Sequence, residues 1–187
     1  MDKIILASQS PRRRELLHLA EIDFEVIVAD TDESFPTGLS FEETAIHIAK
    51  NKGLAVANNE HDDRTILAAD TIVVCNKKII GKPKNREDAI EILSALSGQT
   101  HLVITGVFIL KEGKEITFSD TTAVSFHTLR QEQIIYYVDK YKPYDKAGAY
   151  AIQEWIGAIG IKKVEGDFYN VMGLPISRVV AALTITH

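Results

Sequence analysis

Cysteine is nearly absent from the chain, which has Cys75 and no second thiol among its 187 residues. A single cysteine excludes both a disulfide framework and a cysteine zinc site. Cys75 ends the apolar run 72–75, so we expect a buried structural thiol with no role in chemistry.

Long apolar runs and an excess of basic charge are also missing. No stretch approaches the roughly 20 apolar residues of a membrane-spanning helix, and the first residues lack a signal-peptide pattern. Acidic residues outnumber basic ones by 26 to 21, and the net charge of −5 argues against a general nucleic-acid binder. We therefore expect a cytoplasmic protein that binds neither membranes nor nucleic-acid polymers.

Apolar residues make up 45% of the chain, which is enough for one buried domain over residues 1–187. Strand and helix patterns alternate at first, and two long β-type runs then pair as a hairpin. This order predicts an α/β protein with a mixed sheet: a strand–helix lobe, a hairpin-rich lobe and a cleft between them. The predicted strands are 3–7, 24–28, 65–75, 101–110 and 115–127; the predicted helices are 11–20, 40–58, 86–96, 130–141 and 175–184; an irregular Gly-rich stretch covers 143–173.

A basic turn joins the first strand to the first helix. Ser10 suits the N-cap position, Pro11 suits the first helical position, and arginines follow at 12, 13 and 14. A helix start offers unpaired N–H groups and the positive end of the helix dipole. With Ser8 in the same turn, the pattern predicts a site for an anion, most simply a phosphate, against the alternative of a solvated basic helix start. It is not a P-loop, because no Gly-x-x-x-x-Gly-Lys occurs.

Two carboxylates could take part in chemistry. Asp70 interrupts the apolar run 67–74, and because an unpaired buried charge is costly it must meet a metal, a cation or a cleft; a structural salt bridge is the alternative. Glu33 lies in an acidic loop with Asp30 and Asp32, and such loops are more often simply solvated. Magnesium often takes one or two protein carboxylates plus substrate phosphates, a requirement that Glu33 and Asp70 together would meet.

Three lysines and a glutamine complete the candidate residues. Lys52, Lys82 and Lys146 would balance the charge of a triphosphate, although each taken alone is an ordinary surface residue. Gln153 follows the small residues of segment 145–151; its amide both donates and accepts hydrogen bonds, as reading a base edge requires, and the alternative is a core-packing turn. The acidic cluster 60–63 and the scattered histidines are expected in solvated loops.

Taken in order, these segments resemble the Maf family of nucleoside triphosphate pyrophosphatases, and the resemblance covers nearly the whole chain. Several such motifs in register are far more specific than any one of them. The matching segments are Ala7–Arg13, Asp32–Glu33, Ala49–Lys52, Ala69–Thr71, Lys82–Pro83, Leu96–His101, Asp145–Tyr150 and Gly173–Pro175.

The resemblance implies an elongated α/β fold of two lobes with a central cleft, similar to inosine triphosphatases. It also implies hydrolysis of a nucleoside triphosphate to the monophosphate and pyrophosphate. Asp70 would be the general base, and Glu33 and Asp70 would hold Mg²⁺ or Mn²⁺. The residues that would contact the phosphates are Ser8, Ser10, Arg13, Lys52, Lys82 and Lys146.

The resemblance further bears on the substrate. The branch that prefers dTTP and UTP carries Arg, Thr and Gln at three specificity positions, which match Arg12, Thr71 and Gln153. Modified pyrimidine nucleotides are further candidates. A pyrophosphatase for another nucleotide such as 7-methyl-GTP, and a non-catalytic nucleotide-binding regulator of septum formation, are the alternatives. Ala151 and the pair Glu154–Trp155 depart from the family pattern beside Gln153. The resemblance also suggests a homodimer.

Overall fold

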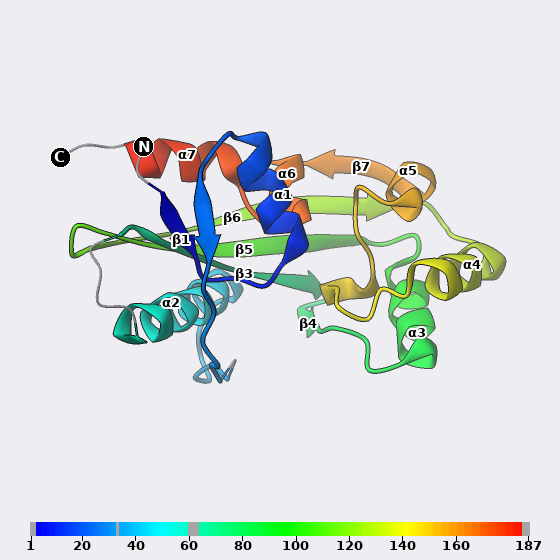
Figure 1. Ribbon diagram of the computed structural model, residues 1–187. Helices are drawn as coiled ribbons and strands as arrows, with labels where there is room; N and C mark the ends of the chain where they lie inside the picture. Colours follow the sequence, from blue (N-terminus) through cyan, green and yellow to red (C-terminus); the bar gives the residue numbers. More distant parts are fainter. Residues whose placement is uncertain (1–2, 33, 60–63, 185–187) are drawn as a thin grey trace. The chain divides into compact units, whose positions relative to one another are not determined.

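The computed structural model describes residues 3–32, 34–59 and 64–184 (Figure 1). Glu33, one of the two predicted metal ligands, and the acidic cluster 60–63 lie outside the described residues.

Most predicted elements are present, with their ends shifted by a few residues. The first half contains β1 (Ile4–Leu6), α1 (Pro11–Leu19), β2 (Phe24–Val26), α2 (Phe41–Asn59), β3 (Ile66–Cys75), β4 (Lys78–Ile80) and α3 (Arg86–Leu96). The second half contains β5 (Thr100–Lys111), β6 (Lys114–Phe126), α4 (Gln131–Tyr141), a short 3₁₀ helix η1 (Ala147–Ala149), α5 (Trp155–Gly160), β7 (Ile161–Glu165), α6 (Phe168–Met172) and α7 (Ile176–Thr184).

The strands form a mixed sheet, which confirms the predicted α/β class. Their order in the described part of the chain is β2-β1-β3-β5-β6-β7, and β4 pairs with β3. Strand β1 is parallel to both β2 and β3, whereas β3–β4 and β6–β7 are antiparallel. Glu112 and Gly113 join β5 to β6 with φ angles of 51° and 73°, as a tight two-residue hairpin turn requires.

The chain divides into two compact units, and strands β3, β5 and β6 each pass from one unit into the other. Unit 1 comprises Met1–Thr71, Thr105–Asp120 and Gly173–His187, and unit 2 comprises Ile72–Ile104 and Thr121–Met172. The predictions of a single domain and of a cleft between two lobes stay predictions.

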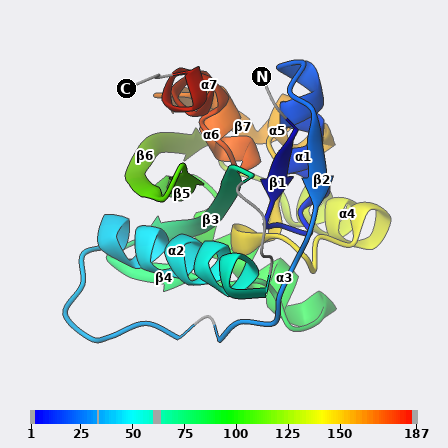
Figure 2. The ribbon, with the colours of Figure 1, turned by 60° about the vertical axis from the view of Figure 1, so that its left-hand side comes forward.

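In unit 1 the strands lie between two helical layers. Helix α2 covers one face, and α1 and α7 cover the other (Figures 1 and 2). Gly53 and Gly106 allow the close approach of α2: a Cβ on Gly53 would lie 2.3 Å from the Phe108 ring, and one on Gly106 would lie 2.2 Å from the Ala45 backbone. The core here is small and aliphatic around Phe108, and includes Ile5, Ala49, Val56 and Ala68.

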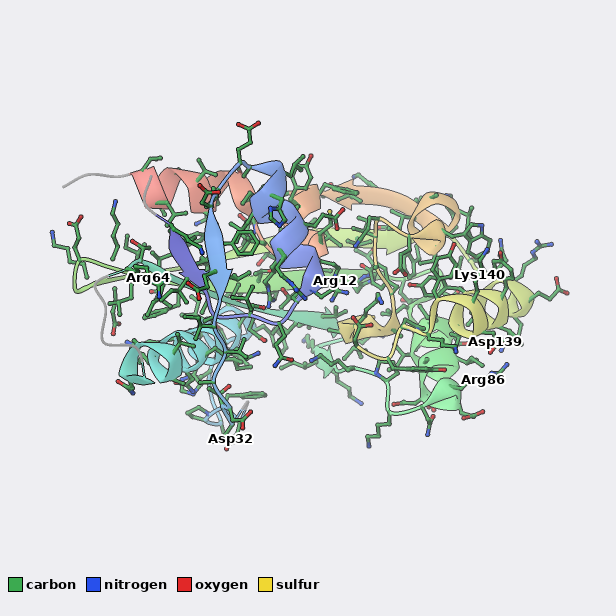
Figure 3. All side chains as sticks on the ribbon, viewed as in Figure 1. Arg12, Asp32, Arg64, Arg86, Asp139 and Lys140 are labelled. Atoms are coloured by element: carbon green, nitrogen blue, oxygen red, sulfur yellow. The ribbon has the colours of Figure 1, made fainter. Side chains whose placement is uncertain are left out.

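In unit 2 helices α3 and α4 pack together beside the 3₁₀ helix. Arg86 of α3 forms a bidentate ion pair with Asp139 of α4, with N···O distances of 2.6 and 3.0 Å (Figure 3). This hydrogen bonding lowers the pKa of the Asp139 carboxyl and raises the pKa of the Arg86 guanidinium. Cys75 is buried as predicted, and burial raises the pKa of its thiol.

One region differs from the prediction. Residues 143–173 were expected to be irregular, but they form η1, α5, β7 and α6, so that expectation is wrong. The elements are three to six residues long, too short to show a helical or strand period. Among the described residues, no helix is both long and apolar enough to cross a membrane.

Candidate active site

The basic turn is organised by Ser8 and Arg13. Ser8 is buried, and its Oγ accepts a hydrogen bond from the backbone N–H of Ser10 at 3.3 Å. Ser10 lies at the N-cap of α1 and Pro11 at the first helical position, as predicted. In the part of the chain that is described, however, the Ser10 side chain makes no capping hydrogen bond. The turn is therefore closed by Ser8 rather than by Ser10.

Arg13 is buried, with 8% of its surface exposed. Its Nε donates to the carbonyl of Gly173 at 2.8 Å, one terminal nitrogen donates to Ser8 Oγ at 2.9 Å, and the other donates to Thr71 Oγ1 at 3.0 Å. The planar guanidinium suits this arrangement, because its donors diverge in a fixed geometry. Arg13 thus joins three segments that are distant in sequence.

Asp70 and Thr71 are the two half-buried residues in the middle of β3, and all the other residues of this strand are buried. Successive side chains of a strand point to opposite faces of the sheet, so the two residues have different partners. Thr71 contacts Arg13 of α1 and, at 2.9 Å, the hydroxyl of Thr105.

Asp70 forms an ion pair with Lys52 of α2, whose Nζ lies 2.7 Å from Asp70 Oδ1. The two side chains are only 16% and 19% exposed, so the pair is shielded but still reached by solvent. The salt bridge that is the alternative interpretation of Asp70 is therefore present. The ammonium of such a pair can also bind an anion, and the carboxylate can bind a cation. The ion pair is therefore compatible with a catalytic or binding role for Asp70.

The remaining predicted residues of unit 1 are less constrained. Arg12 is half-buried in the first turn of α1 (Figure 3). Asp32 is exposed, and its carboxylate accepts from the Ser34 hydroxyl at 2.7 Å and from the Ser34 N–H at 2.9 Å. These hydrogen bonds lower the pKa of Asp32. Within the described residues, no group of three or more His, Cys, Asp or Glu side chains is gathered as a metal site.

Unit 2 carries Lys82, Lys146 and Gln153. Lys82 is exposed just after β4, and Gln153 is exposed just before α5. Lys146 is buried, with its Nζ 2.8 Å from Asp145 Oδ1 and 3.7 Å from Glu154 Oε1. Hydrogen bonds therefore bring together Ser8, Ser10, Arg13 and Thr71, and an ion pair brings together Lys52 and Asp70.

Sequence reasoning missed two groups that contact Arg13 or Thr71, namely the Thr105 hydroxyl and the Gly173 carbonyl. Thr105 is a buried hydroxyl within the otherwise apolar segment 102–110 of β5, a signal that could have identified it. Gly173 begins one of the segments that resemble the family, but the contact of its carbonyl with Arg13 could not have been identified, because it spans 160 positions.

The expectation of solvated histidines is wrong for His101, which is buried. Its Nε2 lies 2.7 Å from the Tyr150 hydroxyl. Burial lowers the pKa of His101 to about 4 and raises the pKa of Tyr150.

Comparisons with known proteins agree with these motifs. The family model described as Maf-like protein matches residues 3–185. A protein of Parabacteroides distasonis named dTTP/UTP pyrophosphatase is 50% identical over 97% of this chain and 94% of its own length. A protein of the same name from Phocaeicola vulgatus is 48% identical over the same shares.

Among solved structures, the Staphylococcus aureus Ham1 protein covers 68% of this chain and 73% of its own at 19% identity and a TM-score of 0.45, a likeness too distant to bear on function. The Maf-like protein model, by contrast, matches nearly the full length of the chain, and the chain therefore belongs to the Maf-like protein family.

Proposed function

We propose that this protein hydrolyses dTTP and UTP between the α- and β-phosphates, releasing pyrophosphate and a nucleoside monophosphate. One observation carries the proposal: relatives that are 44–50% identical over nearly the whole chain bear the name dTTP/UTP pyrophosphatase. The motifs that resemble the family, including Arg12, Thr71 and Gln153, point to the same substrates.

Asp70 is proposed as the general base that deprotonates the attacking water. A carboxylate needs to be held in one orientation to accept a proton efficiently. The charged hydrogen bond from Lys52 at 2.7 Å supports that orientation, and the Lys52 ammonium is proposed to neutralise phosphate charge beside Asp70.

Ser8 is proposed to donate a hydrogen bond to a phosphate oxygen. A hydroxyl has two acceptor positions and one proton. The Oγ of Ser8 already accepts from Arg13 and from the Ser10 N–H, so the proton is the group that it can offer to an anion. Lys82 and Lys146 would add positive charge around the triphosphate. Arg13, with its donors directed to protein oxygens, would act on the phosphates together with Ser8.

A divalent metal, Mg²⁺ or Mn²⁺, is proposed as the cofactor. The Asp70 carboxylate offers oxygen donors in a partly shielded position, and Mg²⁺ is commonly held by one or two carboxylates together with substrate phosphates. The donor type therefore fits, with Asp70 and Glu33 as the protein ligands. When bound, such an ion polarises phosphate oxygens and lowers the pKa of bound water.

Arg12, Thr71 and Gln153 are proposed to select the base. Thymine and uracil present two carbonyl acceptors and one N–H donor. A guanidinium donates only, whereas a Gln amide can meet both kinds of group. We further propose a homodimer, as the family resemblance suggests, and a cytoplasmic location, as the composition of the chain suggests.

A substrate panel tests the proposal. Pyrophosphate release is measured for dTTP, UTP, CTP and 7-methyl-GTP, with Mg²⁺, with Mn²⁺ and with EDTA. We expect release from dTTP and UTP that requires the metal. Preferred hydrolysis of 7-methyl-GTP would replace the substrate assignment, and binding without turnover would favour a nucleotide-binding regulator.

Asp70→Asn tests the catalytic assignment. This variant is expected to keep the fold and to lose at least about 10²-fold in kcat, since general-base catalysis contributes on that order. Asp23→Asn, at an exposed position before β2, is the matched control and should retain wild-type kcat. Retained turnover in Asp70→Asn would remove Asp70 from the role of base.

A further inference from the structure

We propose that Tyr137 is a positioning residue for base selection: its hydroxyl holds both ends of the tight turn that presents Gln153. The inference rests on the proposed function, in which Gln153 reads the base. Nothing in the sequence marks Tyr137 for this role, since it lies within the inward-facing pattern of α4.

Residues 151–154 form the turn in question. The backbone N–H of Glu154 donates to the carbonyl of Ala151 at 3.1 Å, which closes a four-residue turn. Ala151 and Ile152 are buried, whereas Gln153, the third residue, is exposed. The turn therefore projects the Gln153 side chain from an otherwise buried segment.

Tyr137 contacts both ends of this turn through one atom. The N–H of Ala151 donates to the Tyr137 hydroxyl oxygen at 3.2 Å, and the hydroxyl donates to the Glu154 carboxylate. Tyr137 has no exposed surface, so both hydrogen bonds lie in a shielded environment where such contacts are strong. Because Tyr137 holds Ala151 and Glu154, the first and last residues of the turn, it limits the orientations that the Gln153 backbone can take.

The Glu154 carboxylate connects the turn to the proposed phosphate-binding residues. Its second oxygen lies 3.7 Å from the buried ammonium of Lys146. The Glu154 carboxylate thus lies between Lys146, which is proposed to bind phosphate, and the turn that is proposed to bind the base. Displacement of Glu154 would disturb both, but the loss of the Tyr137 hydroxyl would act mainly on the turn.

Tyr137→Phe removes the hydroxyl and keeps the ring, which stacks on Tyr141 with centroids 5.0 Å apart. Tyr136→Phe is the matched control, because it removes a hydroxyl from the preceding residue of α4, where that hydroxyl accepts a hydrogen bond from the exposed Lys140. We measure kcat and KM for dTTP and dCTP, whose bases differ in the groups that Gln153 would read.

The loss of one charge-assisted hydrogen bond predicts a fall of about tenfold in the ratio of kcat/KM for dTTP to that for dCTP. The change should lie in KM, with kcat within about twofold, and Tyr136→Phe should leave the ratio unchanged. In a Gln153→Ala background, Tyr137→Phe should have no further effect on the ratio, since the two residues act as one unit. An undiminished effect in that background, or an equal loss for both nucleotides, overturns the proposal.

Two further measurements keep the test decisive. Trp155, the only tryptophan of the chain, follows the turn directly, so its fluorescence reports binding of a dTTP analogue with a non-hydrolysable α–β bond. If Tyr137→Phe does not fold, Glu154→Ala removes the carboxylate that accepts the hydrogen bond of the Tyr137 hydroxyl. This variant should also lower the ratio of kcat/KM for dTTP to that for dCTP. If the wild-type protein releases no pyrophosphate from dTTP, the proposed function fails on its own. The affinities of the variants for dTTP and dCTP are then compared. If Tyr137→Phe still binds dTTP in preference to dCTP as strongly as the wild type, the role of Tyr137 is overturned; if the preference is lost, that role is supported.

Discussion

Stability should fall below neutral pH because of His101. The imidazole is 1% exposed, and burial lowers its pKa from 6.5 to about 4. Among the described residues its Nδ1 has no hydrogen-bond partner, so a proton added there would carry a charge into a site without an acceptor. The Phe126 and Tyr150 rings, with centroids 5.2 and 5.4 Å from that of His101, make up the apolar side of this site.

The sign and size follow from linkage. Between pH 6.5 and about 4 the unfolded chain binds a proton at His101 that the folded chain does not. Stability contributed by the neutral imidazole is therefore fully present above pH 6.5 and is lost as the pH falls towards 4. At 1.36 kcal/mol for each pKa unit, the full loss is about 3 kcal/mol.

Urea unfolding followed by Trp155 fluorescence measures this loss at several pH values from 4.5 to 7.5. His101→Gln removes the titrating group, and His127→Gln is the matched control, because His127 is exposed. The difference in unfolding free energy between the wild type and His101→Gln should shrink by about 2–3 kcal/mol towards acid pH, whereas the difference for His127→Gln should change little. A difference that stays constant for His101→Gln over this range would refute the assignment of a buried neutral imidazole.

Two further substitutions test the packing of unit 1. Arg13→Lys should lower the unfolding free energy by about 3 kcal/mol, because an ammonium cannot make the three diverging hydrogen bonds of the guanidinium. Arg14→Lys, at an exposed position, is the control in the same urea assay. Equal losses of unfolding free energy in the two variants would contradict the buried role of Arg13. Gly106→Ala should cost about 2–3 kcal/mol, because its Cβ would lie 2.2 Å from the Ala45 backbone, whereas nothing lies within 4 Å of a Cβ on Gly81. Thermal unfolding of Gly106→Ala and Gly81→Ala compares the two, and an unchanged melting temperature for Gly106→Ala would show that α2 does not pack as described.

The sequence predicted the elements that have a clear period or a clear boundary. The helix at Arg86–Leu96 follows Asn85, whose side chain accepts from the Asp88 N–H. The hairpin turn at Glu112–Gly113 lies between two long β-type runs. Residues 143–173 lack both a clear period and a clear boundary. Contacts with other segments of unit 2 stabilise their short elements instead. The N–H of Gly148, for example, donates to the carbonyl of Gly81 at 3.2 Å.

The candidate site divides in the same way. By itself, the sequence determined that a serine and arginines flank the start of α1 and that a carboxylate interrupts a buried strand, because both are patterns of neighbouring residues. Only the tertiary structure decided that the Arg13 guanidinium joins Ser8, Thr71 and Gly173, partners up to 160 positions away, and that Lys52 is the cation beside Asp70. A buried charge must find its hydrogen-bond partners wherever packing brings them, and that choice depends on contacts between segments that no local pattern records.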